Sequence, residues 1–206
     1  MRKCNTKSLT ALALGLLLCS QPILAATDTY TVQKGDSLWK IANKYQVGLT
    51  EIIGANPQFK NPALIYPGDK VHVPLNDPQT LSLEEQVVRL CNAERAKHGL
   101  KPLTMNWQAA RVARYKSDDM RDRSYFSHTS PTYGSPFDML KQFNVPYASA
   151  GENIAKGQTT AQAVVTAWMN SEGHRKNILN ANFTEIGVGY SAGGGTTYWT
   201  QIFLRP

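Results

Sequence analysis

The sequence predicts an α+β protein with two domains. Residues 29–74 read as a strand, two helices and a second strand within fewer than fifty residues. After a segment with two prolines, helical patterns precede a late pair of antiparallel strands. Helices beside an antiparallel strand pair favour a layered α+β architecture. We therefore place the domains at residues 29–74 and 82–206, joined by a linker at residues 75–81.

Residues 1–26 have the order of a secretory signal peptide. A basic start is followed by an apolar stretch at residues 9–18 and by small residues at Ala25 and Ala26. The apolar stretch is too short to span a membrane, and no second one follows. We expect cleavage near residue 26, no membrane span in the mature chain, and a secreted protein of the cell wall or extracellular space.

The net charge narrows the classes of expected partner, and the cysteine content bears on disulfide bonds. Over the whole chain, 22 Lys and Arg oppose 15 Asp and Glu, for a net charge of +7. Loss of the three basic residues in the signal would leave +4, an excess that suits an anionic cell wall. No basic run is interleaved with aromatics, so nucleic acid is not an expected partner. Of three cysteines only Cys91 would remain, which excludes a disulfide framework.

The first domain begins with a short alternating strand at residues 30–33. Gly35 ends it, and Asp36 or Ser37 can cap a helix. The apolar positions of that helix recur at helical spacing: Leu38, Ile41, Ala42 and Tyr45.

A second helix is predicted at residues 50–55, ended by Asn56–Pro57. A turn at Pro67–Gly68 then leads into a strand at residues 70–73. Strand, helix, helix and strand complete the domain.

The motifs "YTVQKGDSLWKIANKY", "NP" and "IYPGDKVHVP" together resemble a LysM module. The resemblance implies binding of N-acetylglucosamine glycans, peptidoglycan or a chitin-like glycan, in a shallow groove between two loops. Leu38 and Ile65 would offer apolar contact to the sugar. Carried over by position, the groove residues are Gly35, Asp36, Ser37, Leu38, Asn56, Ile65, Tyr66, Pro67 and Gly68. Turn chemistry alone is the alternative explanation of each residue taken singly. One module should bind weakly.

The second domain is predicted to open with a helix. Ser82 and Glu85 have capping-box spacing, and Gly99 ends the apolar pattern. A second helix is expected at residues 106–121 and a third after Thr160. Two strands, from Glu185 and from Thr197, follow with a glycine-rich hairpin between them. Core candidates on the last two helices are Ala109, Val112, Ala113, Met120, Val164, Val165 and Trp168.

Five motifs then carry a second resemblance: "LCNAERAKHGLKPL", "YFSHTSP", "GENIA", "AWMNSEGHRKNIL" and "FTEIGVGY". In this order they are similar to the bacterial branch of the CAP superfamily. That resemblance implies an α-β-α sandwich with a cavity lined by two histidines and two acids. The matching positions are His128, Glu152 and His174. No residue matches the second acid, and the nearest, Asp138, has a different spacing.

The chemistry of this cavity allows two interpretations. Ser171 can cap a short helix with His174 in its first turn, which favours a neutral imidazole there. Neutral His128 and His174 could hold a zinc or copper ion, with Glu152 as third ligand or as base for a bound water. Alternatively Glu152 accepts hydrogen bonds from both histidines and fixes three loops. We expect no obligatory cofactor.

Covalent catalysis has little support. Cys91 lies well inside a helix and is expected to be a core residue, and Ser130 lacks a nucleophile elbow. No catalytic residue is therefore assigned. The function predicted first is a wall-tethered module that binds peptidoglycan and presents a His/Glu cavity for a metal or other ligand. Alternatives are a metal-assisted hydrolase of peptidoglycan or peptides and a spore or envelope assembly protein.

Overall fold

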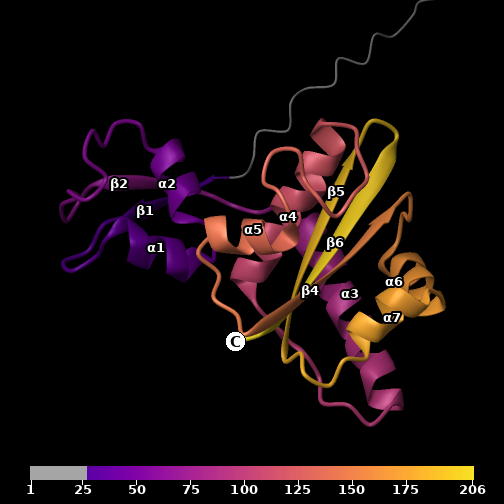
Figure 1. Cartoon of the computed structure of the whole chain (residues 1–206). Helices are drawn as coiled ribbons and strands as arrows, with labels where there is room; N and C mark the ends of the chain where they lie inside the picture. Colours follow the sequence, from indigo (N-terminus) through magenta and orange to yellow (C-terminus); the bar gives the residue numbers. More distant parts are fainter. Residues whose placement is uncertain (1–26) are drawn as a thin grey trace, which may run out of the picture.

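The computed structural model describes residues 27–206, so the predicted signal peptide lies outside the described residues. The LysM part is a two-stranded antiparallel sheet, β1 (Thr27–Thr31) and β2 (Lys70–Pro74), with α1 (Leu38–Tyr45) and α2 (Leu49–Ala55) packed on it (Figure 1). This is the predicted order of elements. Strand β1 ends at Thr31, whereas the predicted strand continued to residue 33. The side chain of Val32, just after the strand, is buried in the core of this domain.

The next helix, α3 (Pro78–Lys97), begins earlier than predicted. Asp77 caps it by accepting a hydrogen bond from the Thr80 N–H at 2.7 Å, and Pro78 occupies the first helical turn. Ser82, the predicted cap, lies inside the helix. An Asp cap followed by Pro is the stronger start signal, because Pro needs no partner for an N–H at that position. The segment between β2 and α3 is therefore residues 75–77, not 75–81.

The second domain is an α-β-α sandwich around a mixed four-stranded sheet. The sheet has the order β3-β5-β6-β4, with β3 parallel to β5 and the other pairs antiparallel. The strands are β3 (Thr104–Met105), β4 (Ser149–Lys156), β5 (Glu185–Gly193) and β6 (Thr196–Arg205). The helices after α3 are α4 (Trp107–Asp122), α5 (Pro136–Gln142), α6 (Ala161–Asn170) and α7 (Glu172–Ile178).

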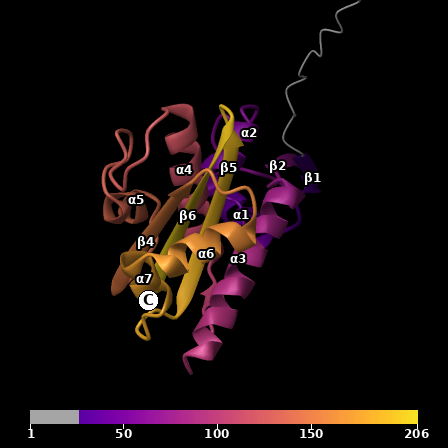
Figure 2. The same ribbon diagram turned by 90° about the vertical axis from the view of Figure 1, so that its right-hand side faces the viewer.

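Two apolar cores form because alternate residues of the sheet point to opposite faces. On one face α4 and α5 bury Ile202 and Leu204, and on the other α3 and α6 bury Trp199 and Phe203. Figure 1 shows the two helical layers on either side of the sheet, and Figure 2 views the α3, α6 and α7 side directly. The predicted core residues of α4 and α6 are all buried.

Helix α4 packs closely on the sheet because β5 lacks side chains where the two meet. A Cβ atom at Gly187 or Gly189 would collide with the backbone of α4 at Ala109–Ala110 and Ala113–Arg114. This close packing fixes α4, which carries residues of both the candidate site and the domain junction. Among the helices of residues 27–206, none is long and apolar enough to cross a membrane.

Candidate functional site

The candidate site of the second domain is centred on His128 and Glu152. Nδ1 of His128, in the loop after α4, lies 2.6 Å from Oε1 of Glu152 on β4. The His128 side chain is 54% exposed and that of Glu152 only 3%, so a buried carboxylate holds an accessible imidazole. With Glu152 ionised, Nδ1–H donates this bond, which leaves the lone pair of Nε2 for a ligand.

Glu152 keeps one oxygen without a partner. Its Oε2 is buried and has no hydrogen bond among the described residues. Burial raises the pKa of Glu152, while the hydrogen bond with His128 and the positive charge of Lys116 oppose that rise. A buried carboxylate oxygen without a partner is costly, so this atom marks where a donor group of a ligand would be favoured.

Lys116 on α4 is a buried cation behind the site. Its side chain is fully buried, and Nζ donates to the carbonyl oxygen of His128 at 2.8 Å and to the Tyr125 hydroxyl at 3.2 Å. Burial lowers the pKa of Lys116, and the charges of Glu152 and Asp119 counter this. Lys116 thus holds the backbone of His128 and balances the negative charge of Glu152.

Asp119, one helical turn after Lys116 in α4, organises the loop that carries His128. Its carboxylate accepts hydrogen bonds from three hydroxyls, those of Tyr125, Ser130 and Thr132. Although burial acts to raise the pKa of Asp119, these hydroxyls hold it below its usual value. The Ser130 hydroxyl is buried and donates to Asp119 at 2.6 Å, so it helps to fix the shape of this loop.

His174 lies on α7, which is tied to β4 beside Glu152. Asn177 donates to the backbone oxygen of Glu152 at 3.1 Å, and Asn153 donates to the backbone oxygen of His174 at 3.1 Å. The pKa of His174 is lowered first by burial and then by the charge of His128. The direction is the predicted one but the main cause is burial. Ser171 occupies the cap position without a side-chain hydrogen bond.

The arrangement does not fit a three-ligand metal centre. Within residues 27–206, no group of three or more His, Cys, Asp and Glu side chains is placed to hold a metal ion. Glu152 bonds to His128 rather than pointing with it at a common centre. It also accepts no hydrogen bond from His174, so the predicted bridge between both histidines is not formed.

Asp138 does not supply the second acid. It is the third residue of α5, where it forms a capping box with Ser135: the Ser135 N–H and hydroxyl both donate to its Oδ2, at 2.9 and 2.6 Å. These hydrogen bonds lower the pKa of Asp138. The charges that oppose the raised pKa of Glu152 are those of Lys116 and His128.

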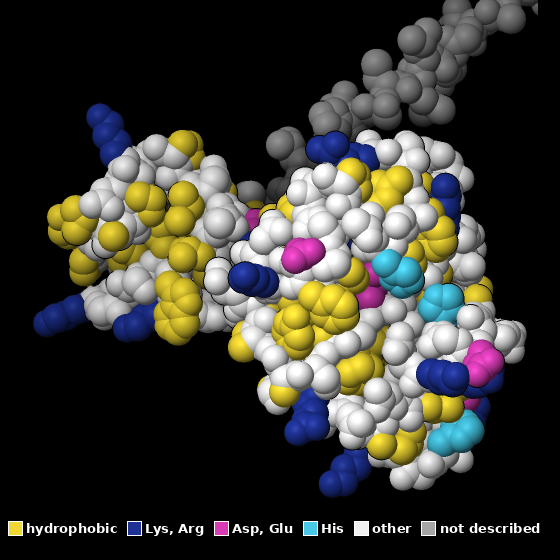
Figure 3. Space-filling model, viewed as in Figure 1, with side chains coloured by type: hydrophobic (Ala, Val, Ile, Leu, Met, Phe, Trp, Pro, Cys, Tyr) yellow, Lys and Arg dark blue, Asp and Glu magenta, His cyan; other side chains and the backbone are white. Residues whose placement is uncertain are grey.

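Figure 3 shows the outer surface of this region. Histidine side chains lie close together on the larger domain, with acidic atoms and a broad hydrophobic patch beside them. Two phenylalanines contribute to the exposed apolar surface of this domain, Phe126 and Phe137, each 49% exposed.

In the LysM part the two predicted loops are built as exposed turns. Gly35 and Gly68 have φ of 89° and 98°, a conformation that favours glycine. Asp36 accepts hydrogen bonds from the Tyr30 hydroxyl and the Gln33 N–H, both at 2.8 Å, and these lower its pKa. Ser37 caps α1 by accepting from the Lys40 N–H.

Two predicted groove residues are structural instead. Leu38 is 3% exposed and belongs to the LysM core, so its side chain cannot cover a sugar face. Asn56 is 1% exposed and bonds to the backbone of His72 and Ile52. Ile65 packs partly against the core.

Exposed apolar side chains of the LysM part lie mainly outside the predicted set. Tyr66 is 64% exposed, as predicted for a groove residue, but Trp39 and Leu64 are also exposed, at 62% and 56%. Trp39 could have been found in the sequence, because it lies off the apolar face of α1 set by Leu38, Ile41 and Ala42. Figure 3 shows hydrophobic atoms spread over the visible face of this smaller domain.

The comparisons with known proteins agree with both resemblances. The model of the Cysteine-rich secretory protein (CAP) family matches residues 88–203, more than half of the chain, and a LysM domain model matches residues 30–74. The chain therefore belongs to the CAP family and carries a LysM domain before the CAP domain, as predicted.

Individual relatives match this chain over different lengths. The chain is 55% identical over 150 residues to "Uncharacterized protein YkwD" of Bacillus subtilis, covering 72% of this chain and 56% of that protein. It is 53% identical over 45 residues to the spore coat assembly protein ExsA of Bacillus cereus, 22% of this chain and 7% of that one. A solved structure of an extracellular SCP-domain protein from Bacillus anthracis superposes with a TM-score of 0.58 at 39% identity, over 68% of this chain and 47% of that one. The chain thus spans about half the length of YkwD and of the B. anthracis protein.

Proposed function

We propose that the LysM domain binds an N-acetylglucosamine glycan of the bacterial wall and thereby keeps the CAP domain at the cell surface. The observation that carries this proposal is the adjacency of the two turns at residues 35–37 and 65–68. The Gly68 N–H donates to the carbonyl oxygen of Val32 at 2.9 Å, which holds the second turn beside the strand end that leads into the first, and the Tyr66 ring is 64% exposed. An exposed aromatic ring suits a sugar face. Extracellular or wall placement agrees with the domain pair.

Cosedimentation with purified sacculi tests this proposal. The Asp36→Ala, Tyr66→Ala double variant should stay in the supernatant, whereas the parent pellets. Phe137→Ala is the matched control, because it removes an exposed aromatic side chain from the CAP domain only. Equal pelleting of parent and double variant would contradict glycan binding by these loops.

For the CAP domain we propose a ligand-binding role for His128, Glu152 and His174. The supporting observation is the buried Glu152 Oε2 without a partner, next to an exposed imidazole. The site suits a ligand with an N–H or O–H donor for Glu152 and a group that Nε2 of His128 can bind. A zinc or copper ion would be held by the two imidazoles, with Glu152 as the carboxylate that orients His128.

A metal-assisted hydrolase of peptidoglycan or peptides is the second candidate. It is favoured by the His128–Glu152 hydrogen bond, since a carboxylate-oriented imidazole can act on a water. A zymogram on purified walls, with and without added zinc, distinguishes the candidates. Clearing by the parent that is lost in His174→Ala would establish the hydrolase, and absence of clearing under both conditions favours the binding role.

A role in spore or envelope assembly is the third candidate. Its support is the similarity over 45 residues to ExsA, which is a spore coat assembly protein by name. Localisation of a fluorescent fusion during growth and sporulation would separate a coat protein from one of the vegetative wall.

A further inference from the structure

The LysM and CAP domains meet through side chains of α2 and α4. Arg111 on α4 binds the Glu51 carboxylate with two parallel hydrogen bonds, Nε to Oε1 at 2.6 Å and Nη2 to Oε2 at 2.8 Å. Nη2 also donates to the Thr50 hydroxyl at 2.8 Å, and the Tyr115 hydroxyl donates to Glu51 Oε1 at 2.9 Å. Bidentate Arg–carboxylate pairs fix relative orientation as well as distance.

Aromatic rings hold the arginine in place. The Arg111 guanidinium carbon lies 4.7 Å from the centre of the Phe143 ring and 5.6 Å from that of Tyr115. Its side chain is 17% exposed, and that of Glu51 is 23% exposed. A planar cation over aromatic rings loses little further freedom when it binds, so the CAP side of the contact is preorganised.

Gly48 supplies the independent observation. A Cβ atom at this position would collide with the Glu51 carboxylate and with the Arg111 guanidinium. The backbone there, φ −74° and ψ 148°, is one that any residue adopts. An added side chain at Gly48 would therefore displace the Glu51 carboxylate and the Arg111 guanidinium from their contact, whereas the local turn itself does not need a glycine.

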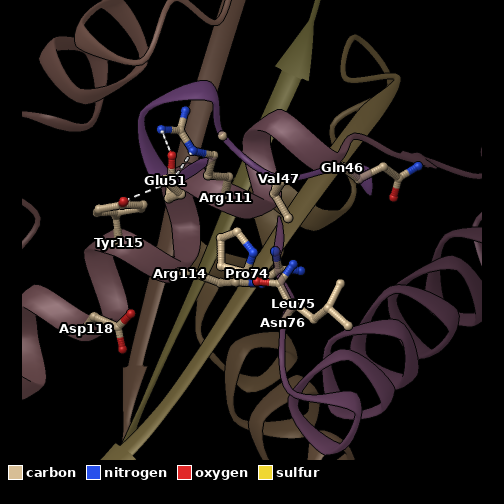
Figure 4. A pocket seen from close by; sticks show the side chains of 11 residues that line it. Gln46, Val47, Glu51, Pro74, Leu75, Asn76, Arg111, Arg114, Tyr115 and Asp118 are labelled. Atoms are coloured by element: carbon tan, nitrogen blue, oxygen red, sulfur yellow. Dashed lines mark hydrogen bonds and ion pairs between the residues drawn. The ribbon is translucent and has the colours of Figure 1, made fainter. Parts of the chain in front are cut away.

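The covalent connection is also short. Only Leu75, Asn76 and Asp77 separate β2 from α3. A cavity of about 230 Å³ at the junction is lined by both domains, including Glu51, Arg111 and Tyr115 (Figure 4). Figure 4 shows Arg111 and Tyr115 converging on Glu51 at this cavity.

We propose that the LysM domain is a fixed part of the CAP domain's surface, held in one orientation by this interdomain contact of Gly48, Thr50 and Glu51 with Arg111 and Tyr115. The LysM domain then does not swing on a linker. Where the proposed glycan binding holds, the contact presents wall glycan to the CAP domain from one direction.

Distances between two spin labels, measured by pulsed electron paramagnetic resonance on the chain of residues 27–206, test the proposal. Labels on Lys60→Cys and Arg89→Cys report on the two domains, since both side chains are exposed. Cys91 does not react, because burial raises its thiol pKa to about 12. The parent should give one narrow distance distribution, and Gly48→Ala should at least double its width.

Gly54→Ala is the matched control. It lies on the same helix, α2, and an added Cβ atom meets no atom within 4 Å, so the distribution should stay narrow. Arg111→Gln disrupts the contact from the CAP side and should broaden the distance distribution as Gly48→Ala does. Because the two substitutions lie in different domains, the test still stands if one of the variants fails to fold.

A broad distribution in the parent would overturn the proposal, as would narrow, unshifted distributions in both Gly48→Ala and Arg111→Gln. Failure of this proposal is distinguishable from failure of the proposed function. The distance measurement needs no glycan, and the sacculus assay needs no fixed orientation of the domains.

Discussion

The two candidate sites of this chain are built in different ways. The LysM loops are exposed turns whose shape comes from the backbone, with Gly35 and Gly68 at positive φ. The CAP site is an exposed His128 resting on buried Glu152, Lys116 and Asp119. We therefore expect that the exposed Tyr66 side chain can be removed with little loss of stability. Removal of the buried groups beneath His128 is expected to reduce stability and to change the site as well.

The largest effect is expected at Asp119. Asp119→Ala leaves the hydroxyls of Tyr125, Ser130 and Thr132 without their acceptor, and buried groups that lose a partner cost about 1–3 kcal/mol each. We expect the free energy of unfolding to fall by about 3 kcal/mol, measured by urea denaturation. Asp122→Ala, a 61% exposed neighbour, should change it by less than about 0.5 kcal/mol. Equal losses in the two variants would contradict a special role for the buried carboxylate.

The interdomain contact links the two regions and should resist mild acid. Partial burial acts to raise the pKa of Glu51, but hydrogen bonds from Arg111 and Thr50 hold it below its ordinary value of 4.5. A carboxyl with a lowered pKa stabilises the folded state above its ordinary pKa and loses that effect only as pH falls through the folded value. The spin-label distance distribution should be the same at about pH 5 as at neutral pH and broaden only in stronger acid. Broadening between neutrality and pH 5 would contradict this.

A smaller effect is expected within the CAP site. The charge of His128 is the second cause, after burial, of the lowered pKa of His174. His128→Gln removes that charge and should raise the pKa of His174, still leaving it below 6.5 because burial persists. Titration of the His174 ring protons by NMR measures this. His72→Gln, in the LysM domain, is the control and should cause no change; a His174 pKa unaltered by His128→Gln would place the two rings too far apart to interact.

The smallest effect on folding is expected in the LysM loops. Tyr66 is 64% exposed, so Tyr66→Ala should change the free energy of unfolding by less than about 0.5 kcal/mol while reducing retention on sacculi. Thermal and urea unfolding of the variant measure the first part. A large loss of stability would show that Tyr66 supports the domain and would remove the contrast between the two sites.

Local patterns were sufficient for much of the fold. The apolar spacing of α4 and α6 predicts buried Val112, Ala113, Val164 and Trp168, and all four are buried. The start of α3 was misplaced because the capping box at Ser82 competes with Asp77–Pro78 one turn earlier, and a cap followed by Pro defines the helix end more strongly. Strand β4 was not predicted, since "GENIA" shows no alternation: Glu152, Asn153, Ile154 and Ala155 are all buried.

Long-range charge balance could not be predicted from the sequence. Lys116 sits in α4 among residues with a typical amphipathic pattern, and nothing local indicates that its Nζ reaches the backbone of His128. Arg95 of α3 is a second example. It is buried and donates to backbone oxygens of Lys101, Ile178 and Asn180, the last two of which are distant in the sequence.

The central claim is that glycan binding belongs to the LysM loops and not to the CAP site. Titration of isotope-labelled protein with N-acetylglucosamine oligomers, followed by two-dimensional NMR, tests it most directly. The account predicts shifts of the backbone amides at residues 35–38, 65, 66 and 68, with those of His128, Glu152 and His174 unchanged. Shifts at the CAP residues with none in the LysM loops would contradict it.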